Sequence, residues 1–413
     1  MDGAQPPIHP ALRRCLAVDP EEFARDIWGR RPLLSEAARL PGDFADLFGP
    51  AAADELLSRR GLRTPFLRIA KDGAVIDSAR YTRPGGTGAQ IGDQIDDEAV
   101  LRLFADGATL VFQGLHRNWP PLLDFAADLV ADLGHPVQIN AYVTPPQSQG
   151  FSAHYDVHDV FVLQIAGGKT WAVHQPVLTA PLRDQPWTGR GAEVAAAAAG
   201  APVLTAELAP GDALYLPRGW LHSATALGEV SIHLTVGIHP LTRHAVVEAL
   251  LRQAAAVPAL RESLPLGLDL DADEALTDVV AATVKELVAA VHAADAALVG
   301  DQLRRQLWAG VRAAPVGPIA QAAAAARVTD STVLTRRRHL RCHVHRDRDE
   351  VVVVLPDRRL RFEGSAAPAL ECALAGAPVA VSELPGPGGA DRRALIARLL
   401  REGLVTAAAA DEE

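Results

Sequence analysis

Two histidines and an aspartate have the spacing of metal ligands. His154 and Asp156 open the stretch AHYDVHDVFVLQIAGGKTWAVH and stand two residues apart. On an extended strand their side chains therefore project from the same face. His222 ends the stretch GDALYLPRGWLH, in which Pro217 and Gly219 bend the chain before the histidine. We expect His222 to begin a neighbouring strand and to supply a third ligand to the same metal.

Two imidazole nitrogens and one carboxylate oxygen leave further positions on a metal open. Non-heme iron(II) oxygenases use this donor set, and the open positions take a bidentate cosubstrate and dioxygen. Three such ligands would also suit zinc. The alternative is that His154 and Asp156 form a local hydrogen-bonded pair and that His222 belongs to the core. The occurrence of both patterns in this order favours the metal site.

Lys169 is the next candidate, because lysine is rare in this chain. Of 40 basic residues only Lys71, Lys169 and Lys285 are lysines, and Lys169 begins a strand-like segment after a Gly-Gly turn. A compact ammonium can pair with a carboxylate where a planar guanidinium would not fit. The distal carboxylate of 2-oxoglutarate would meet that need. The alternative is a lysine at the barrel rim whose charge reaches water.

Two other histidines of the region are weaker candidates. His158 is four residues from His154, about 13 Å along an extended strand, which is too far to share its metal. His233 shares a strand face with Ser231 and Thr235, so it could line the pocket. We expect it in the core or behind the pocket instead.

The composition is that of a folded globular protein. The 413 residues, 49% hydrophobic and 22% charged, suffice for two or three domains. Residues 1–10 show no export signal and the apolar stretch 279–299 carries charges, so we expect a cytoplasmic protein without a membrane span. The three cysteines form no CxxC pair, which fits a reducing compartment.

The charge balance bears on nucleic-acid binding. A net charge of −10 argues against general nucleic-acid binding. The segment RRRHLRCHVHR at 336–346 is locally basic, but the acidic DRDE follows it directly. His343 and His345 share a strand face with Cys342 opposite, and no second cluster supplies ligands. We therefore expect no metal site there, and nucleic-acid binding stays open as the less favoured alternative.

The predicted elements indicate an α+β fold with three regions. Region 1–240 begins with a helical lead-in at 19–57, followed by a hairpin at 62–76, helices at 97–104 and 121–133 and a strand at 109–113. Evenly spaced short strands typical of a jelly roll follow at 138–143, 159–165, 169–173, 205–208, 213–216 and 230–238. The alanine run at 191–200 indicates a surface insertion or short helix.

The remaining regions are predicted from periodicity. Region 241–328 has predicted helices at 243–256, 273–298 and 301–313, whose apolar faces need a partner, so we expect a dimerisation element. Region 329–413 combines predicted strands at 340–344, 351–355 and 359–362 with helices at 368–375 and 390–402. That outline is typical of a small winged-helix domain.

The segment NAYVTPPQSQGFSAHYDVHDVFVLQIAGGKTWAVHQP at 140–176, together with PGDALYLPRGWLHSA, resembles the JmjC-type ribosomal oxygenases of the cupin superfamily. FARDIWGRRPLL at 23–34 and GATLVFQGLHRNWPPL at 107–122 resemble the N-terminal segments of that family. The resemblance covers most of the chain. It implies a double-stranded β-helix core, a helical dimerisation region and a C-terminal winged-helix domain.

The resemblance also assigns roles to individual residues. It implies that His154, Asp156 and His222 bind iron(II) and that Lys169 pairs with 2-oxoglutarate. Asn140 and Tyr142 would line the cosubstrate pocket.

One position departs from the family pattern. Where members tend to carry a serine on the strand after the distal histidine, this chain has Gly237. Thr235 or Ser231 could replace that contact, and we include Thr235 among the expected cosubstrate-binding residues.

We therefore expect a homodimeric dioxygenase that uses iron(II), 2-oxoglutarate and dioxygen. Its expected substrate is an arginine or histidine side chain of a ribosomal protein or peptide. Three alternatives stay open: a hydroxylase of a small molecule or peptide natural product, a winged-helix regulator with a non-catalytic cupin, and a zinc cupin isomerase.

Overall fold

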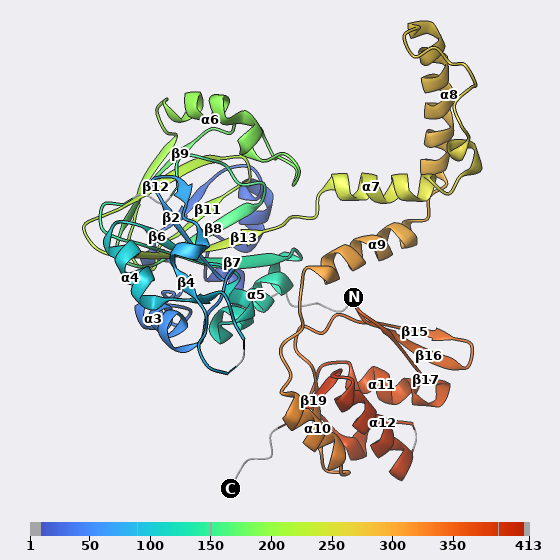
Figure 1. Ribbon diagram of the computed structural model, residues 1–413. Helices are drawn as coiled ribbons and strands as arrows, with labels where there is room; N and C mark the ends of the chain where they lie inside the picture. Colours follow the sequence, from blue (N-terminus) through green and yellow to red (C-terminus); the bar gives the residue numbers. More distant parts are fainter. Residues whose placement is uncertain (1–9, 89, 149–150, 387, 409–413) are drawn as a thin grey trace. The chain divides into compact units, whose positions relative to one another are not determined.

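The computed structural model describes residues 10–88, 90–148, 151–386 and 388–408. The chain forms two compact units, residues 1–240 and 241–413 (Figure 1). Residues 1–9, on which the expected absence of an export signal rests, lie outside the described residues. Among the described helices, none is long and apolar enough to cross a membrane.

The first unit is built on an antiparallel sheet of eight strands. The strand order is β1-β11-β8-β13-β7-β6-β2-β3. The strands are β1 (Leu33–Ser35), β2 (Leu67–Lys71), β3 (Ala74–Val75), β6 (Thr109–Phe112), β7 (Val137–Thr144), β8 (Asp159–Ala166), β11 (Ala213–Leu216) and β13 (Ser231–Ile238). A separate two-stranded ribbon consists of β4 (Thr82–Arg83) and β5 (Gln94–Ile95).

A second sheet of three strands faces the first. Its order is β10-β9-β12, with β9 at Lys169–His174, β10 at Leu204–Leu208 and β12 at Leu221–Ala226. Val162 and Leu214 of the large sheet pack with Trp171 and Leu208 of the small sheet in one buried cluster. Two facing antiparallel sheets with a shared core are the jelly roll that the sequence predicts. The α+β jelly-roll core is confirmed.

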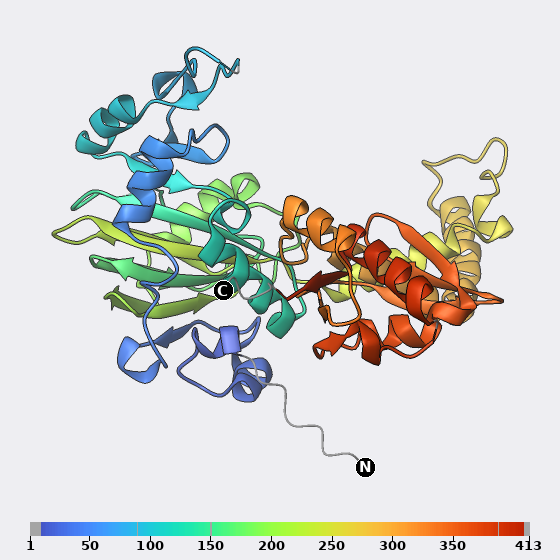
Figure 2. The same cartoon turned by 90° about the horizontal axis from the view of Figure 1, so that it is seen from below.

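Helices cover the other face of the large sheet. They are α1 (Pro10–Arg13), α2 (Pro20–Glu22), a π-helical turn at Phe23–Ile27, α3 (Pro50–Arg59), α4 (Asp97–Ala105) and α5 (Pro120–Leu133), while α6 (Gly191–Ala198) lies in the connection between β9 and β10. In Figure 2, α3 crosses the strands of the large sheet. The carboxylate of Asp96 caps α4 by accepting hydrogen bonds from the amides of Glu98 and Ala99. The predicted helices at 97–104 and 121–133 and the short helix within 191–200 are confirmed.

The predicted helical lead-in at 19–57 is only partly right. Asp19 caps a helical turn at Pro20, as expected. However, Leu33–Ser35 forms strand β1, in which Leu33 pairs with Tyr215 of β11. The helical turn ends at Ile27 and Gly29 takes a left-handed backbone, so Leu33 and Leu34 are free to extend the edge of the large sheet. The hairpin around Asp72 and Gly73 is confirmed as β2 and β3.

The second unit begins with three helices. They are α7 (Arg243–Ala254), α8 (Asp273–His292) and α9 (Ala296–Ala309). The predicted boundary at 298–301 is wrong, because α8 ends at His292 and α9 begins five residues before the predicted start. Asp295 explains the break, since its carboxylate accepts a hydrogen bond from the amide of Ala297 at 2.7 Å and caps α9.

The rest of the second unit packs three helices with two small sheets. The helices are α10 (Pro318–Ala326), α11 (Ala367–Ala373) and α12 (Gly389–Arg401); the sheets are β18-β14-β19 (Val379–Ala380, Val333–Arg336, Val405–Ala407) and β15-β16-β17 (His343–Asp347, Glu350–Val354, Arg359–Glu363). Leu334, Val353, Leu370 and Ile396 are fully buried in their shared core.

The predicted strand at 340–344 is misplaced, because β15 begins at His343. His339 has a left-handed backbone with φ of 58°, so the chain turns before the strand. His343 and His345 lie side by side on β15, with ring centroids 5.8 Å apart. The winged-helix assignment of this region stays a prediction.

Candidate metal centre

The structure brings His154, Asp156 and His222 together. One ligand atom from each lies within 4.8 Å of the other two. His222 is the second residue of β12, whereas His154 and Asp156 lie in the segment between β7 and β8. Nε2 of His222 is 3.7 Å from Oδ2 of Asp156. The three side chains converge on one point, as the sequence predicts.

Backbone pairing fixes this convergence. His154 and His222 form an isolated antiparallel bridge, in which the amide of His222 donates to the carbonyl of His154 at 2.9 Å and the reverse bond measures 3.2 Å. Directly opposed residues of an antiparallel pair project to the same face. The amide of Gly219 donates to the carbonyl of Asp156 at 3.0 Å. The turn before His222 is thereby attached to the segment that carries the other two ligands.

Gly219 is required at this turn. Its φ of 89° is in the left-handed region, and a Cβ there would collide with the carbonyl oxygen of Leu178. The glycine of the sequence pattern therefore serves the close approach of two chain segments beside His222.

Both imidazoles are oriented by a carbonyl two residues earlier in the chain. Nδ1 of His154 is 2.8 Å from the carbonyl oxygen of Ser152, and Nδ1 of His222 is 3.1 Å from that of Trp220. A carbonyl only accepts, so the hydrogen-bond network assigns the proton to Nδ1 in each ring. Nε2 is therefore the ring atom of each histidine that is left to bind a metal.

Electrostatics fit the same assignment. Burial lowers the pKa of His222 to about 4, so this imidazole is neutral at pH 7. Burial alone would raise the pKa of Asp156, but the imidazoles of His158, His222 and His154 outweigh it and lower the pKa. Asp156 is therefore ionised. Two neutral nitrogens and one anionic oxygen form a donor set for a divalent cation.

Lys169 lies in the same interior, at the start of β9. Its side chain is 3% exposed. Nζ donates to Oγ1 of Thr144 at 3.0 Å and lies 3.4 Å from Nδ1 of His233. Burial lowers the pKa of Lys169 to about 7. Within the part of the chain that the structure describes, no carboxylate pairs with this ammonium, so the site has a buried cation whose neighbours are neutral.

The sequence did not single out Thr144, and it placed His233 behind the pocket or in the core. His233 stacks on Tyr142 with ring centroids 4.9 Å apart and also contacts Trp171. Strand pairing explains these contacts, since β13 sets His233 opposite Tyr142, and Thr144 shares the strand face of Tyr142. Side chains alternate along β7, so a site-facing Tyr142 implies that Thr144, two residues later, faces the same site. That alternation is the sequence signal that could have identified Thr144.

Asn140, Tyr142 and Thr235 lie on the same face of the large sheet. Asn140 pairs with Thr235 across β7 and β13. Its side-chain oxygen accepts a hydrogen bond from the amide of Gly114 at 3.0 Å, which fixes the amide orientation. Burial raises the pKa of Tyr142 to about 12, so its hydroxyl is a neutral donor. Their shared face agrees with the sequence, and their role in binding a cosubstrate stays a prediction.

Gly237 stands beside His158 rather than beside Lys169. A Cβ at position 237 would lie 3.0 Å from Cε1 of His158 and 3.1 Å from Cγ of Gln138. The glycine therefore leaves room for an imidazole next to Asp156. Ser231, a suggested replacement contact, accepts a hydrogen bond from the side-chain Nε2 of Gln164 at 2.9 Å. The hydroxyl next to Lys169 comes from Thr144 instead.

The connection between β9 and β10 borders the candidate metal centre. The ring of Trp187 lies 6.3 Å from that of His154, centroid to centroid. Tyr155 is 1% exposed and donates from its hydroxyl to the carbonyl of Gln185 at 3.0 Å. Tyr155 also packs against Val194 of α6. Residues 175–203 are thus attached to the segment that carries two ligands.

Comparison with known proteins agrees with this fold and site. A family model for the JmjC domain matches residues 122–246, which include the three candidate ligands and Lys169. The chain is 32% identical over 255 residues to ribosomal oxygenase 1 of Gallus gallus, covering 61% of this chain and 40% of that one. It is 36% identical over 138 residues to the bifunctional lysine-specific demethylase and histidyl-hydroxylase NO66 of Drosophila persimilis, covering 33% and 19%.

Solved structures share the fold at low sequence identity. The structure of E. coli ycfD superposes with a TM-score of 0.52 at 16% identity, covering 95% of this chain and 98% of that one. A structure of E. coli YcfD in complex with cobalt and 2-oxoglutarate gives 0.51 at 17% identity, covering 94% and 98%.

Residues 122–246 thus match a JmjC domain, and the His-Asp-His set lies within the matched range. The chain is similar in sequence to ribosomal oxygenases. It spans less than half the length of the curated relatives described above.

Proposed function

We propose that this protein is an iron(II)- and 2-oxoglutarate-dependent hydroxylase of a protein side chain. The observation that carries the proposal is one interior that contains both a convergent His-Asp-His set and a buried lysine without an acidic partner among the described residues. A metal alone would explain the first feature. A cosubstrate with a free carboxylate explains both.

The metal would be held by His154, Asp156 and His222. Two neutral imidazoles and one carboxylate suit iron(II) and leave positions for further ligands. When bound, iron(II) and 2-oxoglutarate supply the oxidation of a substrate C–H bond by dioxygen. The chain contributes orientation, because the carbonyls of Ser152 and Trp220 fix both imidazole rings before any metal binds.

The distal carboxylate of 2-oxoglutarate would pair with Lys169. Thr144 holds the ammonium from one side and His233 lies on the other, so the charge is already positioned. A carboxylate entering this interior would supply the opposite charge that the buried ammonium lacks. Asn140, Tyr142 and Thr235, on the adjoining sheet face, would line the cosubstrate.

The proposed substrate is an arginine or histidine side chain of a ribosomal protein. Support comes from the names of relatives, which include ribosomal oxygenases and a histidyl-hydroxylase. Action on a ribosomal protein would place the enzyme in the cytoplasm. Incubation with separated ribosomal proteins and mass spectrometry for the gain of one oxygen atom tests this choice.

We also propose that the chain acts as a homodimer through its helical region. Val280, Val284 and Val288 recur every four residues on α8 and are about half exposed. Such an apolar stripe on a helix needs a partner surface. Light scattering at micromolar concentration should give twice the chain mass, and Val284→Glu should shift it toward the single-chain mass. A single-chain mass for the wild type would remove this part of the proposal.

The central test is an anaerobic titration of the metal-free protein with iron(II) and 2-oxoglutarate. The visible absorption band of the iron(II)–2-oxoglutarate chelate should develop in the wild type, vanish in His222→Ala and weaken in Lys169→Met. Absence of the band in wild-type protein that binds iron(II) would contradict the proposed cosubstrate. His244→Ala, an exposed histidine of α7, is the matched control.

A further inference from the structure

A cavity of about 380 Å³ lies on the face of the large sheet that points away from the candidate metal centre. Leu110, Val143 and Ile232 form its floor. Tyr142 precedes Val143 in the chain and His233 follows Ile232. Both project to the opposite face, because side chains alternate along a strand. The cavity is therefore separate from the site described above.

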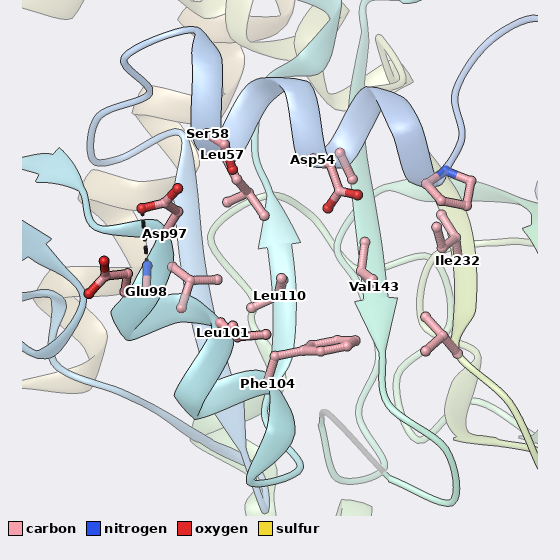
Figure 3. A pocket seen from close by; sticks show the side chains of 14 residues that line it. Asp54, Leu57, Ser58, Asp97, Glu98, Leu101, Phe104, Leu110, Val143 and Ile232 are labelled. Atoms are coloured by element: carbon pink, nitrogen blue, oxygen red, sulfur yellow. Dashed lines mark hydrogen bonds between the residues drawn. The ribbon is translucent and has the colours of Figure 1, made fainter.

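Two helices form the walls of this cavity. One wall is a single face of α3 and includes Asp54, Leu57 and Ser58; the other is the start and one face of α4. Figure 3 shows Asp54 extending from α3, and Leu101 and Phe104 extending from α4 toward Leu110 and Val143 of the sheet. The result is a groove with an apolar floor between two helices.

The edge of the groove exposes large apolar side chains. Leu101 is 66% exposed and Val230 is 40% exposed, whereas Val143 and Ile232 on the floor are at most 7% exposed. An apolar surface that continues from a cavity onto the molecular exterior is typical of an interaction site. The volume also falls within the range of about 300–1,000 Å³ that is usual for ligand pockets.

The rim of the groove is acidic. Asp54, Asp97 and Glu98 belong to the lining, which includes no lysine or arginine. Within the described part of the chain none of these three carboxylates forms an ion pair, and Asp97 accepts only the amide hydrogen of Glu98 at 3.1 Å (Figure 3). Uncompensated carboxylates around an apolar floor favour a cationic, partly apolar occupant and disfavour nucleic acid or an anionic membrane.

We infer that this groove is a docking site for a basic protein segment. The segment inserts an apolar side chain between α3 and α4 and sets lysines or arginines against Asp54, Asp97 and Glu98. The identity of that segment as part of the protein substrate rests on the proposed function. Docking itself needs neither metal nor 2-oxoglutarate, because the groove and the candidate metal centre lie on opposite faces of the sheet.

The probe is a fluorescein-labelled peptide, GRRLFRRG, measured by fluorescence anisotropy with metal-free full-length protein. Two matched peptides replace the four arginines with glutamate, or the leucine and phenylalanine with serine. We expect binding of GRRLFRRG alone. The affinity should fall as salt is raised, because the rim carboxylates are exposed.

Two variants test the groove directly. Leu101→Arg adds a cation at the apolar edge and should raise the Kd of the peptide about tenfold. Asp54→Asn with Glu98→Gln should raise it by a similar factor. Val203→Arg, at a 51% exposed valine outside the groove, is the control for the first variant. Glu207→Gln with Glu36→Gln, at two exposed glutamates outside the groove, changes the net charge equally and is the control for the second.

The outcomes separate this inference from the proposed function. Equal peptide affinity in wild type and both groove variants overturns the docking site, as does an equal loss in the charge control. Failure of the iron(II)–2-oxoglutarate band together with groove-dependent peptide binding overturns the proposed function and leaves the docking site standing. A normal band together with peptide binding that does not depend on the groove supports the proposed function and overturns the docking site.

Discussion

The two ends of the jelly-roll interior are held in place by different means. At the candidate metal centre, each imidazole is fixed by a carbonyl two residues earlier, and His154 pairs with His222 through backbone bonds. At the other end, Lys169 is held by the side chains of Thr144 and His233, which come from the paired strands β7 and β13 of the large sheet. The first end is satisfied before a ligand arrives. The second has a buried lysine that is either deprotonated or, when charged, lacks an opposite charge among the described residues.

The two ends therefore differ in what they contribute to the stability of the folded, ligand-free protein. Backbone bonds orient the imidazoles with little penalty, whereas a buried ammonium without an opposite charge opposes folding. The interior therefore combines a preorganised metal end with a cosubstrate end that is destabilising until occupied. The following predictions test that contrast, from the largest expected effect to the smallest.

Removal of a ligand from the preorganised end should have the largest effect. Even residues that only support a metal ligand typically contribute about 10–100-fold to metal affinity, so Asp156→Ala should weaken iron(II) binding by at least about 100-fold. Succinate formation should fall to the level without enzyme. Metal titration and succinate assay measure both, and unchanged succinate formation would refute the assignment of Asp156.

Lys169→Met should stabilise the ligand-free protein while weakening 2-oxoglutarate binding. The pKa of Lys169 is lowered from 10.5 to about 7, so between these values the unfolded chain binds the extra proton. The wild-type free energy of unfolding therefore rises with pH in this window, and the full penalty, at most about 5 kcal/mol, applies below pH 7.

Urea unfolding at pH 6 and pH 9 measures this effect. The gain of Lys169→Met over wild type should be larger at pH 6 and should shrink toward pH 10. A variant less stable than wild type at pH 6 would mean that Lys169 is not destabilising in the folded state. Lys71→Met, which removes an exposed ion pair with Asp106, is the matched control.

The affinity for 2-oxoglutarate should fall as pH rises above 7. Above that value the unliganded Lys169 is neutral, and pairing with a carboxylate requires uptake of one proton. The apparent Kd should therefore rise about tenfold per pH unit above 7 and level off below it. In Lys169→Arg the guanidinium stays charged, so whatever its affinity, the dependence above pH 7 should be flat. Parallel pH profiles for both proteins would contradict the assignment.

Gly237→Ser should have the smallest effect and should act at the metal end. Its Cβ would lie 3.0 Å from Cε1 of His158, a side chain that can move, so we expect a loss of about 1 kcal/mol in stability. His158→Ala should remove most of that loss in the double variant. A double-mutant cycle by urea unfolding measures the coupling, and additive losses would show that His158 does not set the requirement for glycine.

The two ends also differ in what the sequence can predict. The spacing of His154 and Asp156 predicts that both point the same way, and the turn at Pro217 and Gly219 brings His222 to them, so local patterns suffice for the metal end. The predicted strand is absent at 154–156, where only an isolated bridge at His154 forms. Thr144 reaches Lys169 only because β7, β13 and β9 close into one interior, and no short pattern contains that information. The same limit hid β1, whose leucines pair with a strand 180 residues later.

Boundaries failed for a related physical reason. The break between α8 and α9 depends on one capping aspartate inside a continuous apolar pattern, and β15 starts late because His339 takes a left-handed backbone. Periodicity describes which face of an element is apolar, but single residues that turn the chain decide where the element stops.

The connection between β9 and β10, residues 175–203, has a consequence for the evolution of substrate range. Trp187 of this connection borders the candidate metal centre, and the hydroxyl of Tyr155 donates a hydrogen bond to the carbonyl of Gln185 within it. The connection includes helix α6 and contributes no strand to either sheet. Selection can alter its length and side chains without disturbing strand pairing or the ligands. Among proteins that share this centre, differences in accepted substrates should therefore correlate with differences in the length and sequence of this connection.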